Sequence, residues 1–285
     1  MNPMLKYRGG KSREIPLFSR YIPKRFDTYL EPFLGGGAVF FHLEPDRAIV
    51  NDVNDKLISF YLNVQKKYDK MTIELDTIQM QYENNQKQYK KKKFKNPNAH
   101  VENKNEALYY KIRDMYNNKI EPIYMKGVIY YFINKTAYSG MIRHNSSGEY
   151  NVPFGRYPNL NTKIVTDKHA ALLKQAQLFN FDYESIFNMA NTKDFMFLDP
   201  PYDCIFNDYG NIDMMNGFDE EQHVRLAHDF RNLNCKALMI IGKTPLTEKL
   251  YKKYIRDEYF KSYSVNIRNR FKADAKHIIV TNYKV

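Results

Sequence analysis

The sequence predicts an α/β fold, in which helices cover both faces of a mostly parallel sheet and the chain ends in an antiparallel hairpin. Short apolar segments alternate with helical stretches along most of the chain, an order typical of parallel sheets. Three of these segments end in an aspartic acid, and the tail alternates in polarity as two antiparallel strands do. The five predicted parallel strands cover residues 26–31, 48–52, 178–182, 194–199 and 236–242.

The first half of the predicted sheet contains a glycine turn. A short amphipathic helix is expected near residues 12–21, before the first strand, which runs into the glycines at 35–37. A helix begins at Ala38, and the second strand ends in Asp52. This order describes a nucleotide-binding βαβ unit, in which glycines admit a cofactor and the acid suits a ribose. No Gly-Lys-Ser/Thr follows the turn, which argues against a phosphate-binding P-loop.

The middle of the chain differs in composition. Residues 65–106 are rich in Lys, Gln, Asn and Tyr and include the run Lys90–Lys93. We interpret them as an inserted segment, partly helical, whose lysines form a solvated face, while a position near phosphate stays open as the second interpretation. Residues 107–135 are predicted to be helical, and a loop rich in Gly, Ser and Asn follows at 136–161.

The last predicted elements complete the sheet. A helix is expected after the third strand and another after the fourth, and the tail is expected to form the hairpin. The predicted helices cover residues 183–190 and 219–233, and the hairpin strands cover 259–267 and 277–285. Ligands of such sheets bind at the carboxyl ends of the strands, so Asp52 and Asp199 should face one site.

The composition points to a polyanionic partner. Lys and Arg number 44 against 32 Asp and Glu, which gives a formal net charge of +12. Such an excess fits nucleic acid, and some of the 24 Tyr and 19 Phe must be exposed enough to stack on bases. Cys204 and Cys235 lack metal-ligand spacing, so no metal is expected. The chain shows neither a signal peptide nor a membrane span, and we expect a cytoplasmic protein with no membrane partner.

The motif that carries the most chemistry is Asp199-Pro200-Pro201-Tyr202, directly after a buried strand. The nitrogen of an exocyclic base amine is a poor nucleophile because its lone pair is delocalised. The Asp199 carboxylate and the Pro200 carbonyl could accept its two N–H groups and favour a tetrahedral nitrogen, while Tyr202 stacks on the base. Such preorganised acceptors also stabilise the positive charge that grows on the nitrogen during methyl transfer.

Together these motifs resemble the Dam-like, or alpha, group of DNA adenine-N6 methyltransferases, over nearly the whole chain. The order is that of the group: glycine motif, long middle segment, then the DPPY motif. Besides residues 199–202, the resemblance rests on Lys6-Tyr7-x-Gly9-Gly10-Lys11 and on residues 31–37, 51–54 and 151–157. It implies a Rossmann-like fold that uses S-adenosylmethionine, gives S-adenosylhomocysteine, needs no metal and acts on double-stranded DNA.

The resemblance also implies roles for single residues around the cofactor. Lys11 would bind the methionine carboxylate, Asp52 the ribose and Asp182 the N6 of the cofactor's adenine. The full cofactor-binding set is Tyr7, Lys11, Phe33, Gly35, Gly37, Asp52, Asp182 and Asp199, and the target base would be held by Asp199, Pro200, Pro201 and Tyr202. Phe33 would pack near the sulfonium. Phe218 resembles a residue that shapes the adenine pocket, although a helix-capping role is equally open.

A DNA-contacting hairpin is implied at residues 138–145. Arg143 can donate two hydrogen bonds to guanine O6 and N7, and Tyr138 and Met141 can fill the gap left by a flipped adenine. The predicted DNA-contacting residues are Lys6, Tyr138, Ser139, Met141, Arg143, Asn145 and Arg156. GATC and other GAT-containing sites both stay open, because Ser139 and His144 stand where the group often has Asn and Tyr.

We therefore expect two domains. Residues 1–55 and 166–285 would form the catalytic, cofactor-binding domain, and residues 56–165 the target-recognition domain. A monomer on DNA is expected. Whether a separately acting restriction endonuclease accompanies it, and whether the host is a bacterium or a phage, stays open.

Other activities were weighed against this one. Cytosine-N4 enzymes usually carry Ser in place of Asp199, and protein-glutamine and some RNA enzymes favour Asn there. Cytosine-C5 enzymes need a nucleophilic cysteine after proline, whereas Cys204 follows Asp203 and Cys235 follows Asn234. A non-catalytic DNA-binding regulator with the same fold is the alternative from another class. Intact Lys11, Asp52 and Asp199 argue against that regulator.

Overall fold

A computed structural model describes residues 1–7, 9–202, 218–261 and 276–284. The chain divides into two compact units. The helical unit contains residues 3–9 and 54–174, and the sheet unit contains residues 10–53 and 175–285.

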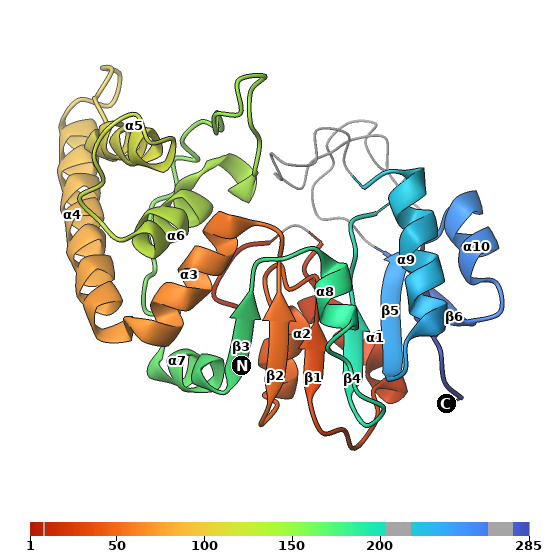
Figure 1. Cartoon of the computed structure of the whole chain (residues 1–285). Coiled ribbons are helices and arrows are strands. Elements are labelled where there is room, and N and C mark those ends of the chain that lie inside the picture. Colours follow the sequence, from red (N-terminus) through yellow and green to blue (C-terminus); the bar gives the residue numbers. More distant parts are fainter. Residues whose placement is uncertain (8, 203–217, 262–275, 285) are drawn as a thin grey trace. The chain divides into compact units, whose positions relative to one another are not determined.

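The sheet unit is built on seven strands in the order β3-β2-β1-β4-β5-β7-β6 (Figure 1). The first five pair in parallel, and β7 pairs antiparallel with both β5 and β6. The strands are β1 (Tyr29–Glu31), β2 (Ala48–Asn51), β3 (Ala176–Phe179), β4 (Phe195–Leu198), β5 (Lys236–Gly242), β6 (Ile255–Phe260) and β7 (Lys276–Thr281). The predicted fold class, a mostly parallel sheet with antiparallel C-terminal strands, is confirmed.

Short helices connect these strands and cover the sheet, with α8 and α9 on the opposite face from α1 and α2 (Figure 1). They are η1 (Lys11–Arg13), α1 (Ile15–Phe18), η2 (Ser19–Tyr21), α2 (Ala38–Leu43), α8 (Tyr183–Phe187), α9 (Glu220–Asn232) and α10 (Pro245–Tyr251). The single helix expected over 12–21 is wrong in detail. It is three pieces, and Pro16, which cannot donate a backbone hydrogen bond, sits in the first turn of α1.

The core of the sheet unit explains why strands β4 and β5 could be predicted from the sequence. All four residues of β4 are buried, as are the five central residues of β5, because helices or loops cover both faces of a parallel sheet. Leu198, Met239, Ile241 and Val280 belong to one apolar cluster. Strand β4 is thus fixed on both faces directly before Asp199.

The C-terminal hairpin is present, but its first strand was predicted out of place. β6 begins at Ile255, four residues earlier than expected, and ends at Phe260. Its residues alternate between half-buried and exposed, as expected for an edge strand, so polarity alone fixed neither end. Residues 262–267 of the prediction lie outside the described residues.

The helical unit packs around α6, whose residues from Gly127 to Asn134 are all buried. Gly127 is required there, because a Cβ would come within 2.8 Å of the Asn63 side chain on α3. The other described elements are α3 (Asp55–Lys66), α4 (Tyr68–Lys95), α5 (Lys104–Tyr116), η3 (Tyr138–Gly140) and α7 (Asp167–Lys174).

Helix α4 occupies most of the predicted inserted segment and is 28 residues long. Its buried positions are Met71, Leu75, Ile78 and Tyr82, spaced three or four apart along one face. Beyond Tyr82 the helix buries nothing more. None of the described helices combines the length and the apolar character needed to cross a membrane.

Candidate active site and nucleic-acid interface

The centre of the candidate active site is an ion pair between Lys11 and Asp199. The Lys11 ammonium donates to both carboxylate oxygens of Asp199, at 2.6 Å and 2.7 Å. The Lys11 side chain is 2% exposed and that of Asp199 23% exposed, so a buried cation holds a carboxylate that still reaches the surface. Strand β4 delivers Asp199 and the 3-10 turn η1 delivers Lys11.

Tyr202 completes this centre. Its hydroxyl accepts from the Lys11 ammonium at 2.5 Å and donates to Asp199 Oδ1 at 3.3 Å. Its ring meets the edge of the His277 ring, with 4.9 Å between the centroids. Two prolines separate Asp199 from Tyr202 and fix the backbone between them, so the tetrapeptide is held at both ends.

A second buried carboxylate lies beside this centre. Glu14 Oε2 accepts from Tyr259 at 2.7 Å and lies 2.8 Å from His277 Nδ1, and Glu14 Oε1 pairs with Lys261. Burial raises the pKa of Glu14, but the hydrogen bonds from His277, Lys261 and Tyr259 and the charge of Lys11 outweigh it. The net pKa is about 2. No sequence motif points to Glu14 or His277. They lie 263 residues apart, so only the fold brings them together.

Burial also raises the pKa of Asp199, and the Lys11 ammonium opposes that change through its charge and its hydrogen bonds. Burial lowers the pKa of His277, so its imidazole is neutral at pH 7, and the hydrogen bond to Glu14 acts the other way. For Asp199 the effect of burial is the larger one, so its net pKa is raised, and Lys11 is the cation that stabilises its charged form.

The glycine turn is tied to the end of β2. The Gly35 amide donates to Asp52 Oδ2 at 2.8 Å, and Asn51 Nδ2 donates to the Pro32 and Phe181 carbonyls at 3.0 Å. Gly37 has φ +67° and precedes α2; a Cβ there would lie 2.8 Å from the Phe41 ring. Asp52, at the end of β2, is therefore hydrogen-bonded to the glycine turn that precedes α2.

A third carboxyl group, Glu31, ends β1, the strand that lies between β2 and β4 in the sheet. It is buried and accepts from the Tyr29 hydroxyl at 2.9 Å. Burial raises the pKa of Glu31 well above its ordinary value, and the negative charges of Asp199 and Asp52 raise it further. Because β2, β1 and β4 are adjacent, the carboxyl edge of the sheet collects acidic groups that suit a cationic ligand.

Aromatic rings lie beside the glycine turn. The Phe33 ring is 5.4 Å from Tyr183 and 6.2 Å from Phe218. Phe218 also packs on His223 at 4.8 Å, across the start of α9, where Asp219 is the N-cap. This contact matches a hydrophobic staple, so the capping role considered for Phe218 is present in the structure.

Asp182 is the N-cap of α8 and is engaged by protein groups. Its Oδ1 accepts from the Glu184 amide at 3.0 Å, and its Oδ2 accepts from Arg225 at 2.9 Å. Its side chain is exposed. Its role toward a cofactor stays a prediction.

In the helical unit, the predicted DNA-contacting loop follows α6 and is stabilised by hydrogen bonds between its own residues. Isolated bridges join Ala137 to Phe154 and His144 to Tyr150. Arg143 donates from Nε to Asn151 Oδ1 at 2.8 Å, which aligns an exposed guanidinium. Asn145 Oδ1 accepts from the Ser147 and Glu149 amides and so closes a tight turn.

Other residues of this loop present side chains outward. The Tyr138 ring is 56% exposed, Ser139 is exposed with φ +55°, and Met141 is half-buried. Gly155 can only be glycine, since a Cβ would lie 2.4 Å from the Tyr157 ring. Arg156 has φ +54°, and its guanidinium lies 3.7 Å from Glu106.

Lys6 and Tyr7 also belong to the helical unit. The Lys6 backbone exchanges two hydrogen bonds with Asn134, and the Lys6 ammonium lies 4.0 Å from the centre of the Tyr157 ring. Burial and the positive charge of Lys6 together lower the pKa of Lys135 to about 8. Two lysines thus lie close together beside the loop. The contact of Tyr7 with a cofactor stays a prediction.

The described residues include one of the two cysteines, Cys235, and the acidic and histidine side chains that could bind a metal. Within these residues no group of three or more His, Cys, Asp or Glu side chains could hold a metal ion. Cys235 is buried, and burial raises the pKa of its thiol to about 12, so it is no nucleophile at neutral pH. Cys204 lies outside the described residues.

A parallel sheet with this C-terminal antiparallel pair, a glycine turn after β1 and a DPPY motif after β4 define the S-adenosylmethionine-dependent methyltransferase fold. The comparisons with known proteins narrow the class. Residues 7–268 match the family model of the D12 class N6 adenine-specific DNA methyltransferases, and the chain belongs to this family. It is therefore an adenine-specific DNA methyltransferase.

Curated relatives agree with this assignment. The chain is 32% identical to the Type II methyltransferase M.CviBI of Paramecium bursaria Chlorella virus NC1A, over 99% of this chain and all of that protein. It is 31% identical to the Type II methyltransferase M.MjaIII of Methanocaldococcus jannaschii, over 82% and 81% of the two chains. It is 29% identical to the DNA adenine methylase of Escherichia coli K12, over 87% and 84%.

Proposed function

We propose that this enzyme moves a methyl group from S-adenosylmethionine directly to N6 of an adenine flipped out of duplex DNA, within GATC or a related site. The observation that carries the proposal is the Asp199 carboxylate, held by Lys11 at the end of β4 with Tyr202 beside it. A rigid acceptor next to an aromatic ring is what an exocyclic amine on a purine requires. Flipping follows because the amine is inaccessible inside a duplex.

The chemistry assigned to the pocket is modest. Asp199 and the Pro200 carbonyl accept the two N–H groups, Tyr202 stacks on the ring, and the growing positive charge on N6 is stabilised by the carboxylate. Asp199 or solvent then accepts the proton that N6 loses after transfer. Lys11 donates to both Asp199 oxygens, so the base amine must share this carboxylate with Lys11 or displace it.

The cofactor's chemistry fits the groups at the carboxyl edge of the sheet. S-adenosylmethionine supplies an electrophilic methyl on a sulfonium and carries an ammonium, a carboxylate and a ribose. Asp52 and Asp199 place acidic groups there for the ribose and the cations, and Lys11 is the neighbouring cation for the carboxylate. Phe33, Gly35, Gly37, Asp182 and Tyr7 complete the proposed cofactor set.

Reading of the DNA sequence is assigned to the helical unit. We infer that Arg143, aligned by Asn151, binds a guanine, and that Tyr138 and Met141 enter the space left by the flipped adenine. Lys6, Ser139, Asn145 and Arg156 are the further proposed contacts. We propose that residues 56–165 form the target-recognition domain of a monomer acting on DNA.

The site is tested by mapping methylation. Genomic DNA from a host without adenine methylation is incubated with the enzyme and S-adenosylmethionine, and N6-methyladenine is located by sequencing. We expect one sequence, GATC or another GAT-containing site, to be modified on both strands. Methylation at unrelated adenines would contradict the specificity. Tight DNA binding with no S-adenosylmethionine binding would favour a non-catalytic regulator.

A further inference from the structure

The C-terminal end of α4 carries an unusual concentration of positive charge. Six lysines lie between Lys87 and Lys95, and no Asp or Glu occurs from Asn84 to Val101. These six equal half of the chain's formal net charge of +12. All residues from 90 to 100 are exposed, so this charge faces solvent. The six lysines are Lys87, Lys90, Lys91, Lys92, Lys93 and Lys95. Together with the rings of Tyr89, Phe94 and Pro97, we call them the α4 basic end.

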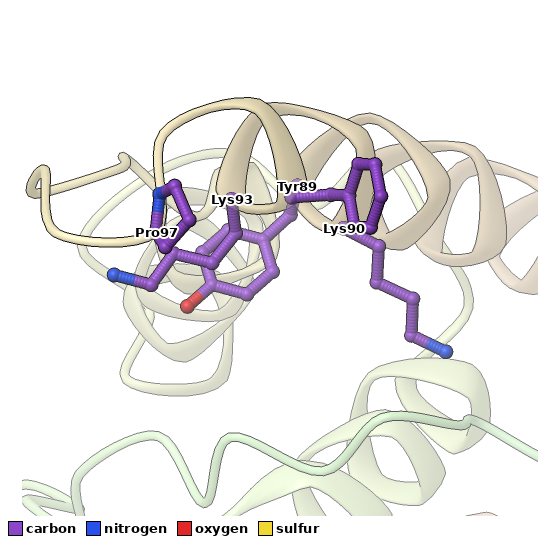
Figure 2. A pocket seen from close by; sticks show the side chains of 5 residues that line it. Tyr89, Lys90, Lys93 and Pro97 are labelled. Carbon is purple, nitrogen blue, oxygen red and sulfur yellow. The ribbon is translucent and has the colours of Figure 1, made fainter.

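An open pocket of about 430 Å³ lies on this surface, lined by Tyr89, Lys90, Lys93, Phe94 and Pro97 (Figure 2). Its lining is mainly apolar apart from the two lysines, whose side chains extend in opposite directions in Figure 2. The Phe94 side chain is 89% exposed. An apolar floor between ammonium groups matches the alternation of sugar and phosphate along a nucleic-acid strand.

Stability of the helix alone does not account for this arrangement. Cations in the last turn favour a helix C-terminus, and Lys93 donates to the Ala99 carbonyl at 3.0 Å, which explains part of the run. Lys87, Lys91 and Lys95, however, follow one another at four-residue spacing, where like charges repel. The buried face of α4 ends at Tyr82, so packing does not offset that repulsion.

The position of the α4 basic end within the helical unit suggests what covers it. Tyr82 donates to the Tyr157 carbonyl at 2.5 Å, which anchors the middle of α4 to the 151–157 motif. The lysines lie roughly 8–20 Å farther along the helix axis, at 1.5 Å per residue. Duplex DNA carries one charge per about 1.7 Å of its axis, so a duplex read at the loop has phosphates over that range.

We propose that the α4 basic end binds the phosphate backbone of duplex DNA outside the recognition sequence, through Lys90, Lys91 and Lys92, with Phe94 and Pro97 against the sugars. The inference rests on the proposed function, since it takes duplex DNA as the substrate. Backbone contacts carry no sequence information, so this surface adds affinity for any duplex long enough to reach it. It would hold the enzyme on DNA between sites.

The test compares two charge-matched triple variants. In one, Lys90→Gln, Lys91→Gln and Lys92→Gln remove the proposed contacts; in the control, Lys66→Gln, Lys67→Gln and Lys70→Gln remove three exposed lysines near the other end of α4. Binding is measured on duplexes of about 12 and about 30 base pairs, with and without the recognition sequence, over a range of salt concentrations. Circular dichroism checks that α4 stays helical.

We expect the first variant to bind the long duplex about tenfold more weakly, with or without the site, and to lower the salt slope by about 2–3, near 0.9 per lost contact. On the short duplex it should bind and methylate as the wild type does. Equal weakening in both variants would reduce the effect to net charge and overturn the proposal, as would unchanged binding to long DNA.

The two proposals fail separately. If the wild type does not methylate any duplex, the proposed function is wrong, whatever the lysine variants do. If it methylates the short duplex and the triple variant binds long DNA normally, only the α4 contact is wrong. Phe94→Ala serves as a second probe, and we expect a loss of about threefold on long DNA alone, since exposed aromatic contacts add to charge.

Discussion

The two functional regions of the molecule satisfy their polar groups in opposite ways. Around Asp199, polar and charged side chains from distant parts of the sequence pair with one another inside the sheet unit: Lys11 with Asp199, and Glu14 with His277 and Lys261. In the loop at 138–156, polar side chains bond to their own neighbours in sequence, as Arg143 does to Asn151 and Asn145 to Glu149.

This difference suits two different tasks. A reaction centre profits from charges that are already in place, because reorganisation then costs little when the transition state forms. A DNA-reading loop must instead keep its donors exposed for a partner, and local bonds can aim a side chain without burying it. Substitutions should therefore affect turnover and stability in the first region, and discrimination in the second.

The largest effect is expected from Asp199→Asn. The amide keeps the shape but replaces one acceptor oxygen by a donor, so turnover should fall about 10²–10³-fold. The affinity for S-adenosylmethionine should stay within a few-fold of the wild type. Transfer of a labelled methyl group to DNA measures the first quantity and calorimetry the second. Asp257→Asn, on an exposed carboxylate of the same unit, is the control. Unchanged turnover for Asp199→Asn would remove this residue from the pocket.

Glu14→Gln should reveal the buried charge network through stability. The pKa of Glu14 is lowered to about 2, so its contribution is full above its ordinary value of 4.5 and is lost as the pH falls through about 2. We expect the variant to lose on the order of 2–3 kcal/mol of unfolding free energy at neutral pH and to show a flatter response to acid.

Glu258→Gln is the matched control for this experiment. The pKa of Glu258 is also about 2, owing to hydrogen bonds from Lys243 and Lys276, but these groups are on the surface. Solvent screens such pairs, so its loss should matter less. Chemical denaturation between pH 2.5 and 7 compares the two. Equal losses would mean that burial of Glu14 adds nothing.

Substitutions of Arg143 distinguish recognition of a base from general electrostatic binding of DNA by the loop. Arg143→Ala should cost about 1–3 kcal/mol of discrimination at one guanine, measured as the ratio of kcat/KM for the cognate site and its single-base variants. Arg143→Lys keeps the charge but loses the bidentate geometry, so it should restore general binding without restoring discrimination. A loss shared by all sequences would instead assign Arg143 to phosphate.

The smallest effect concerns the lysine pair beside the loop. Burial lowers the pKa of Lys135 to about 8, and the charge of Lys6 contributes. Since the ammonium is lost as the pH rises through about 8, DNA affinity should fall by less than tenfold between pH 7 and 9. Lys135→Arg stays charged and should flatten that profile. Identical profiles for the two proteins would show that Lys135 does not face DNA.

Sequence patterns that lie within one element predicted the structure of that element well. β5 was predicted with the bounds it has, because a buried parallel strand is a continuous apolar run. The glycine turn and the acid at the end of the following strand were also predicted because they belong to one βαβ unit, in which a bond of 2.8 Å joins Gly35 to Asp52. α10 was missed although Thr244 and Pro245 form a recognisable start signal, because a helix of about two turns shows little periodicity.

Contacts between distant segments could not be predicted. Lys11 was assigned to the cofactor carboxylate by resemblance, and its pairing with Asp199, 188 residues away, emerged only from the fold. Glu14 and His277 carried no motif at all. Polarity patterns report whether a residue is buried, but the partner that makes burial of a charge tolerable is set by topology.

The most direct test of the central claim is to identify the methylated atom. The enzyme is incubated with duplex DNA and S-adenosylmethionine, the DNA is digested to nucleosides, and the products are separated by mass spectrometry, with Asp199→Asn in parallel. We predict N6-methyldeoxyadenosine from the wild type and at most about one hundredth of it from the variant. Methylcytosine as the product, or equal yields from both proteins, would contradict the account.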